Sequence, residues 1–190
     1  MIAGLRSGPG SRERARKPES PAAGRIACPT LVLGLGNRLL RDDGVGLRML
    51  EELEGDERFG DCEFVDGGTQ GIALLGYFEG RASAVILDAV ALGASPGTVH
   101  VLRGPDLQAV HGSTAHEGGA LEVLALAKLL GQAPNEVVIV GIEPDEVRTG
   151  IGLSDRVETA LPEAVAKARE ILEERYVPGG AGKNYRNEGH

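Results

Sequence analysis

Residues 30–54 read TLVLGLGNRLLRDDGVGLRMLEELE. The first six residues are mostly apolar and run into Gly-Leu-Gly, which is typical of a buried strand that ends at a tight turn. The apolar side chains of Val45, Met49 and Leu53 then recur every four residues, which predicts one face of a helix over 43–54. A strand, a glycine-rich turn and a helix in this order form the unit from which α/β sheets are built.

The rest of the chain repeats this alternation. Strand-like runs occupy 61–65, 84–87, 98–103 and 136–140, and helical patterns occupy 70–79, 118–130 and 154–175, the last with Ser154 as its N-cap. The link between the third and fourth strands, DAVALGASPG, is shorter than the dozen or so residues that a parallel crossover needs, so we expect the fourth strand to be antiparallel. We predict a three-layer α/β fold, with a mostly parallel five-stranded sheet and helices on both faces.

The 190 residues suit one folded domain with flexible ends. Residues 1–29 are rich in Arg, Ser, Pro and Gly without periodicity, which predicts a disordered extension. Residues 30–177 form the domain, and 178–190 read as a flexible tail. The net charge is −8, and because residues 1–29 hold six Lys/Arg and two Asp/Glu, the remainder carries −12. This acidic body argues against nucleic acid as a partner.

Two further features concern the location of the protein. The sequence contains no apolar run near the ~18 residues of a membrane helix, so we expect no membrane partner. Cys28 and Cys62 form neither a CxxC pair nor a zinc-ligand spacing. Since residues 1–29 also lack the apolar region of a secretory signal, we expect a cytoplasmic protein.

Three residues are candidates for a metal site. Asp43 follows the first strand and turn, Asp88 follows the apolar run AVIL, and His116 lies in GSTAHEGG before a helix. Sites of open α/β sheets gather at the carboxyl ends of the strands, and oxygen with imidazole donors suits a transition metal. The pattern alone favours Asp42 and Asp43 as helix-capping or solvated charges, and their position does not tell which one would face a cleft. Asp88 is the stronger candidate, because a carboxylate that ends a buried strand is costly unless it is paired.

Other polar residues have simpler interpretations. Asp66, in VDGGTQG, fits a turn in which aspartate bonds the nearby backbone. His100 lies within a predicted strand, where a structural role is a simpler interpretation than a role as a metal ligand. The long segment GIEPDEVRTGIGLS (141–154) is predicted to flank the same cleft as the candidate site.

Gly34–Asn37 (GLGN) raises a different possibility. Two glycines after a strand partly match the dinucleotide-binding fingerprint, but its third glycine is replaced by Leu39. A non-catalytic α/β module that binds a nucleotide or anion at Gly34–Asn37 is therefore a weaker alternative. The other interpretation is that Gly34 and Gly36 allow a tight backbone turn at the strand end.

Several of these segments, taken together and in order, resemble the hydrogenase maturation proteases. The matching stretches are LVLGLGNRLLRDDGVG, VDGGTQG, ILDAV, STAH and GIEP…GLS, spread over 31–154. The resemblance implies an endopeptidase that removes the C-terminal peptide from the nickel-loaded precursor of a nickel–iron hydrogenase large subunit. A non-catalytic metal-binding accessory protein is the alternative within the same resemblance.

The resemblance also implies roles for individual residues. Asp43, Asp88 and His116 would be the metal-binding and catalytic residues, and Asp66 a further candidate for recognition or catalysis. The first position is often Glu in the family, so Asp43 reaches one methylene less far. The nickel would be carried by the substrate, and other divalent metals would substitute in the isolated protein.

We predict that residues 1–28 are dispensable. They offer no apolar face whose burial could offset the entropy of ordering them. Deleting them should leave the melting temperature and the rate of precursor cleavage nearly unchanged, as measured by thermal melts and gel mobility of the precursor. A large loss of either would mean that this segment packs on the domain or docks the substrate.

Overall fold

The computed structural model describes residues 30–60, 62–104, 107 and 119–175. Its centre is a five-stranded sheet with the strand order β2-β1-β3-β5-β4. The strands are β1 (Thr30–Leu35), β2 (Glu63–Gly68), β3 (Ser83–Ala89), β4 (Val99–Arg103) and β5 (Glu136–Ile142). All pairs are parallel except β4 with β5, so the antiparallel fourth strand is confirmed.

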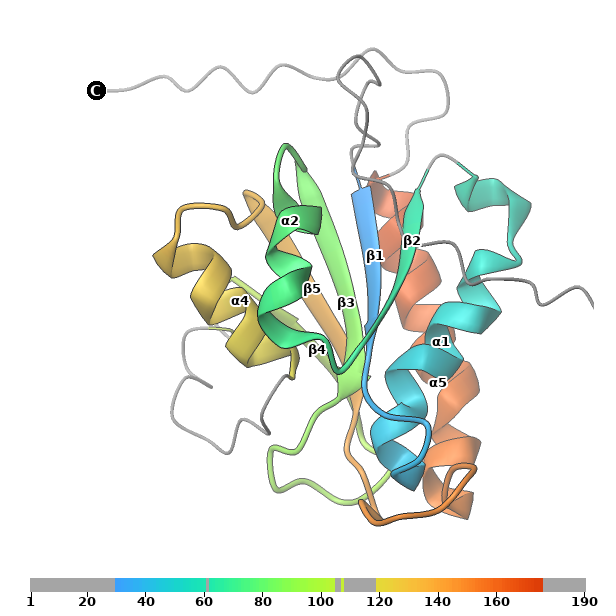
Figure 1. The fold of residues 1–190 in the computed structure, drawn as a ribbon. Coiled ribbons are helices and arrows are strands. Elements are labelled where there is room, and N and C mark those ends of the chain that lie inside the picture. Colours follow the sequence, from blue (N-terminus) through green and yellow to red (C-terminus); the bar gives the residue numbers. More distant parts are fainter. Residues whose placement is uncertain (1–29, 61, 105–106, 108–118, 176–190) are drawn as a thin grey trace, which may run out of the picture.

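Helices cover both faces of this sheet, as Figure 1 shows. One face carries α1 (Val45–Glu54) and α5 (Asp155–Arg175), and the other carries α2 (Leu75–Phe78) and α4 (Ala120–Leu129). Three short 3-10 helices are η1 (Arg41–Gly44), η2 (Glu57–Phe59) and η3 (Gly71–Leu74). The predicted three layers are confirmed, but several boundaries were wrong. The strand predicted over 61–65 runs over Glu63–Gly68, so Asp66 lies within β2 and not in a turn after it. The predicted helix 43–54 begins as the separate turn η1, and 70–79 divides into η3 and α2.

Alternate residues of the strands feed two cores. Val32 of β1 faces α1 and α5 and packs in a cluster with Met49 and Leu161. Its neighbours Leu31 and Leu33 face α2 and α4 and join the second cluster. A strand covered on both faces has no polar side, which explains why 31–35 has no polar side chain.

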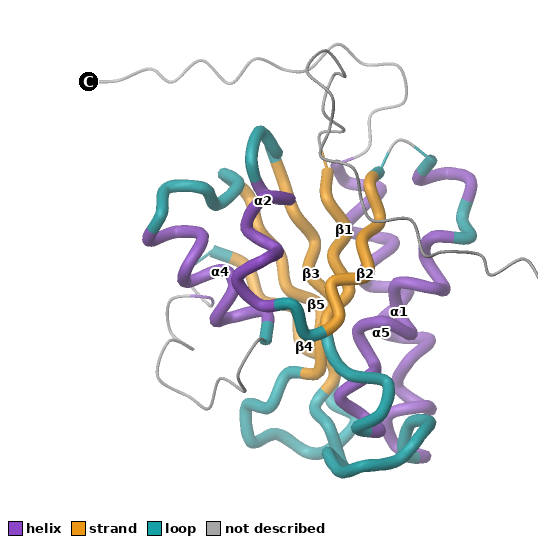
Figure 2. Tube along the Cα trace, in the orientation of Figure 1, coloured by secondary structure: helices purple, strands orange, loops and turns teal. Residues whose placement is uncertain are grey.

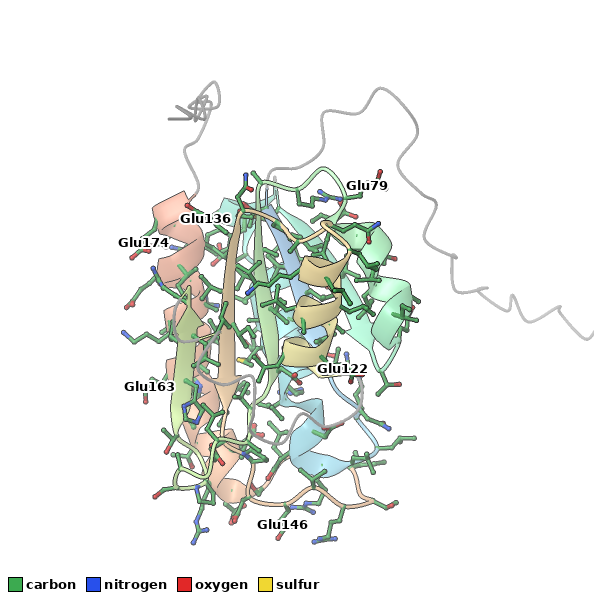
Figure 3. All side chains as sticks on the ribbon, turned by 90° about the vertical axis from the view of Figure 1, so that its left-hand side faces the viewer. Glu79, Glu122, Glu136, Glu146, Glu163 and Glu174 are labelled. Carbon is green, nitrogen blue, oxygen red and sulfur yellow. The ribbon has the colours of Figure 1, made fainter. Side chains whose placement is uncertain are left out.

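α5 covers most of one face and shows the predicted apolar stripe. Val157, Ala164 and Ala168 are fully buried, and Leu161 is nearly so. Acidic and basic residues occupy the outer side of α5, including Glu163 and Glu174 in Figure 3. Among the described residues, every helix is either too short or too polar to cross a membrane.

Glycines let α1 approach the sheet closely. A Cβ added to Gly46 would lie 2.3 Å from the carbonyl oxygen of Leu87 and 2.4 Å from that of Leu35. A Cβ added to Gly36, which has φ +113°, would lie 1.7 Å from the carbonyl oxygen of Asp43. The start of α1 and the turn η1 are therefore pressed onto the carboxyl ends of β1 and β3. The interpretation of the first glycines as turn and packing residues is supported.

The segments that follow β1, β3 and β5 all emerge at one edge of the sheet. In Figure 2 these loops gather beneath the strands, at the lower end of the molecule. Glu146, in the segment after β5, marks this edge in Figure 3, and Glu136, the first residue of β5, marks the opposite one. The carboxyl edge is where parallel α/β sheets place their sites.

Gly46→Ala should destabilise the domain by about 3 kcal/mol, because the added methyl group meets two strand carbonyls and α1 must move away. Gly55→Ala is the matched control. Its added Cβ meets nothing within 4 Å and its φ of −74° suits alanine, so stability should stay the same or rise by about 0.5 kcal/mol. Urea unfolding of both variants checks this, and equal stabilities would contradict the close contact.

Candidate functional site

Asp43 and Asp88 approach one another at the carboxyl edge of the sheet. Asp43 belongs to η1, directly after the turn that follows β1, and its Oδ2 accepts a hydrogen bond from the Asn37 amide at 2.8 Å. Asp88 is the penultimate residue of β3 and is 6% exposed. The pairing of β1 with β3 brings the segment after β1, which contains η1 and Asp43, beside the end of β3 that holds Asp88.

Asp88 is held by two backbone amides. Its Oδ1 accepts from Ala89 and its Oδ2 from Ala120, the first residue of α4, both at 2.8 Å. Burial raises the pKa of Asp88 to about 7, since these two bonds only partly offset the loss of water and the negative charge of Asp43 adds to the rise. The two carboxylates therefore lie within electrostatic range, and two of the three predicted ligands are brought together.

The third predicted ligand is not tested by the structure. His116 lies outside the described residues. Within the described part of the chain, no group of three or more His, Cys, Asp or Glu side chains could hold a metal ion. The carboxylates of Asp43 and Asp88 supply oxygen donors, so a complete site needs at least one more donor. The full set of Asp43, Asp88 and His116 stays a prediction.

Asp42 has a different role from its neighbour. It is fully buried, and its carboxylate accepts four hydrogen bonds from the segment after β5. Oδ1 accepts from the Ser154 amide at 2.6 Å, and Oδ2 accepts from the Ser154 hydroxyl (2.8 Å) and the amides of Glu146 (2.7 Å) and Asp145 (3.0 Å). Burial alone would raise the pKa of Asp42, but these bonds outweigh it and lower the pKa. Asp42 is thus neither solvated nor a cap, since no side chain caps α1.

The segment 141–154, which was predicted to flank the candidate site, begins with the last two residues of β5 and then passes beside η1. Its hydrogen bonds to Asp42 place it beside η1. Ser154 directly precedes α5, the place predicted for the N-cap, and its hydroxyl donates to Asp42.

Sequence reasoning missed a third buried carboxylate, Glu143, which is 5% exposed. It accepts hydrogen bonds from the amides of Leu92 and Gly93, and its Oε2 lies 2.9 Å from Nε2 of His100. Burial would raise the pKa of Glu143, but the bonds from Leu92, His100, Gly93 and Ala94 outweigh it and lower the pKa. The sequence did contain a signal for this buried carboxylate, because Glu143 directly follows an apolar strand just as Asp88 lies near the end of one. The structural interpretation of His100 is supported by this pairing.

Asp66 lies on the outer edge of the same region. It is exposed, stands opposite Gly34 in the β1–β2 pairing, and its Oδ2 accepts from Arg38 at 3.4 Å. Arg38 also pairs with Glu51 of α1. The structure therefore shows Asp66 as an exposed partner of Arg38 beside the turn that precedes η1.

Comparisons with known proteins point to one family. The sequence model of the HycI hydrogenase maturation protease family matches residues 47–171, a range that includes Asp88 and His116 and starts just after Asp43. The hydrogenase 2 maturation protease of Escherichia coli K12 is 35% identical over 148 residues, covering 76% of this chain and 90% of its own. The hydrogenase expression/formation protein HoxM of Azotobacter vinelandii is 36% identical over 156 residues, covering 80% and 75%.

Solved structures show the same fold. The hydrogenase maturating endopeptidase HybD from E. coli superposes with a TM-score of 0.68 at 32% identity, covering 77% of this chain and 93% of its own. A [NiFe] hydrogenase maturation protease, HybD from Thermococcus kodakarensis, gives 0.61 at 29% identity, covering 75% and 97%. The chain therefore belongs to the hydrogenase maturation protease family, and it is a hydrolase of the endopeptidase class.

Glu143→Gln should lower the free energy of unfolding at pH 7 by about 2 kcal/mol, because buried amides lose a charged acceptor. Because the pKa of Glu143 is lower in the folded state, its carboxylate stabilises the fold at pH values above the unfolded pKa of ~4.3. This stabilisation is lost as the pH falls through the folded-state pKa. The deficit of the variant should therefore shrink on acidification below about pH 4. Urea unfolding at several pH values measures this, with the exposed Glu174→Gln as control. A deficit that does not change with pH would contradict it.

Proposed function

We propose that this endopeptidase removes the C-terminal peptide from the nickel-loaded precursor of a nickel–iron hydrogenase large subunit. The observation that carries the proposal is that η1, which holds Asp43, packs against β3, near whose end Asp88 lies, in a chain of this family. The name of the relative from T. kodakarensis specifies a [NiFe] enzyme, which supports this substrate class.

Asp43, Asp88 and His116 complete the coordination of the nickel that the precursor brings. Two carboxylates and one imidazole form a donor set that nickel accepts. Holding the metal of the substrate places the scissile bond beside these residues, where the ion polarises the scissile carbonyl or activates a water molecule. Because the ion arrives with the substrate, only loaded precursor completes the site, and nickel loading becomes a checkpoint for cleavage.

Removal of a ligand tests the proposal. His116→Ala and Asp43→Asn should each lower cleavage of nickel-loaded precursor by at least about 100-fold, because the ion loses a donor. For His116→Ala, stability should stay within about 0.5 kcal/mol, since the residue lies in a segment of small residues. Gel mobility of the purified precursor and thermal melts supply the two measurements.

His100→Ala is the matched control. It removes the partner of Glu143, so it should lower stability and leave the cleavage rate of folded protein near that of the wild type. Nickel-free precursor should resist the wild-type enzyme. If His100→Ala stops cleavage and His116→Ala does not, the metal histidine is misassigned. If neither substitution changes cleavage, His116 is not a ligand of the nickel, and the proposed donor set is wrong.

A further inference from the structure

Asp42 joins two segments that are far apart in the sequence. The first is the β1–α1 segment (residues 36–44), which carries Asp43, and the second is the β5–α5 segment (residues 143–154). The four donors to Asp42 all belong to the β5–α5 segment and lie 103 to 112 residues further along the chain. Asp42 is fully buried, and because the donors to its carboxylate among the described residues all come from this remote segment, its side chain holds the two segments together.

Backbone hydrogen bonds continue this junction. The Arg41 amide donates to the Gly150 carbonyl at 3.1 Å, and the Gly150 amide donates to the Leu39 carbonyl at 2.9 Å. The Asp42 amide donates to the Glu146 carbonyl at 3.2 Å, and Nε of Arg41 pairs with Oε2 of Glu146 at 2.9 Å. The two segments are therefore bonded both at Asp42 and at the residues that precede it.

The turn that these bonds hold is strained. Arg41 has φ +51°, a left-handed conformation that costs a non-glycine residue of this kind about 1–3 kcal/mol. Such a conformation persists only when its surroundings enforce it. Arg41 immediately precedes Asp42 and Asp43, so relaxation of this turn would move the carboxylate of Asp43 away from Asp88.

We propose that Asp42 is a positioning residue, which fixes Asp43 in the candidate site by fastening the β1–α1 segment to the β5–α5 segment. The inference rests on the proposed function in one respect, namely the role of Asp43 in cleavage. Asp42 itself faces Ser154, Asp145 and Glu146, and it acts only through the turn that it holds.

The structure supplies a direct reporter of the position of Asp43. The Asn37 amide donates to Oδ2 of Asp43 at 2.8 Å, so its hydrogen exchange reports whether that carboxylate stays in place. The amides of Arg41 and Gly150 report the junction in the same way. These rates are compared with those of amides in β3, which report global stability.

The experiment uses Asp42→Asn in the full chain, with Asp56→Asn as the matched control. Asp56 accepts from the Arg58 amide and pairs with Arg58 and Arg169 beyond the far end of α1. Asp42→Asn should speed exchange at Asn37, Arg41 and Gly150 by about tenfold relative to β3. The side-chain NH2 of the asparagine would face a backbone N–H, and two donors cannot form a hydrogen bond. It should lower kcat for nickel-loaded precursor by about ten- to a hundredfold, with KM changed much less.

Asp56→Asn should lower the melting temperature and leave the relative exchange rates and kcat unchanged. Wild-type exchange at Asn37 in Asp42→Asn overturns the inference, whether or not kcat falls, because Asp42 would then not act through Asp43. If Asp42→Asn does not fold, Ser154→Ala removes one donor and keeps the carboxylate. It should speed the same amides by a smaller factor, and unchanged rates there overturn the inference too.

The outcome separates this inference from the proposed function. If Asp43→Asn cleaves precursor as fast as the wild type, the proposed function of Asp43 fails. The exchange rates of Asn37, Arg41 and Gly150 still decide whether Asp42 holds the turn. If Asp43→Asn is inactive and Asp42→Asn shows wild-type exchange and kcat, the function stands and the positioning role is wrong.

Discussion

Parallel pairing of β1, β3 and β5 is the constraint on which the candidate site depends. In the β1–β3 pair Thr30 lies opposite Ser83, and in the β3–β5 pair Ser83 lies opposite Glu136, so the three strands start at the same level. Strands paired in this way end at the same edge, so the residues that follow them emerge together. The turn η1, which holds Asp43, then packs against β3, which holds Asp88, although the two are far apart in the sequence. Close packing of α1 through Gly46 holds η1 against that edge.

Three buried carboxylates at this edge behave differently for a physical reason. Asp42 and Glu143 each accept several hydrogen bonds, and these outweigh the cost of removing a charge from water. Among the described residues, Asp88 accepts hydrogen bonds from two amides, and because burial outweighs these bonds and the charge of Asp43 adds to the effect, its pKa rises to about 7. A carboxylate whose lone pairs are filled by backbone amides serves the fold, whereas one that is buried with few donors has capacity left for a ligand. This distinction supports Asp88 as the functional member.

Much of the fold was predictable because it follows from local patterns. Apolar runs and four-residue spacings located the five strands and the long helices, and the short link after Asp88 predicted the antiparallel β4. The errors fell where local pattern is weak. The turn η1 was read as the start of a helix, since Val45 and Met49 extend a helical spacing that says nothing about the residues before them. The family was recognisable from ordered motifs, and the comparisons show it.

The sequence by itself determined the strand order along the chain, the apolar faces and the presence of acidic residues at strand ends. It did not separate Asp42 from Asp43, because adjacent residues of one type have the same local pattern. Only the tertiary structure decided between them, since the partners of Asp42 arrive from Ser154 and its neighbours more than a hundred residues later. The importance of Glu143 was hidden for the same reason: its partners lie in the loop after β3 and on β4. Which donors surround a buried charge is a property of the folded chain, and that property separates a structural carboxylate from a functional one.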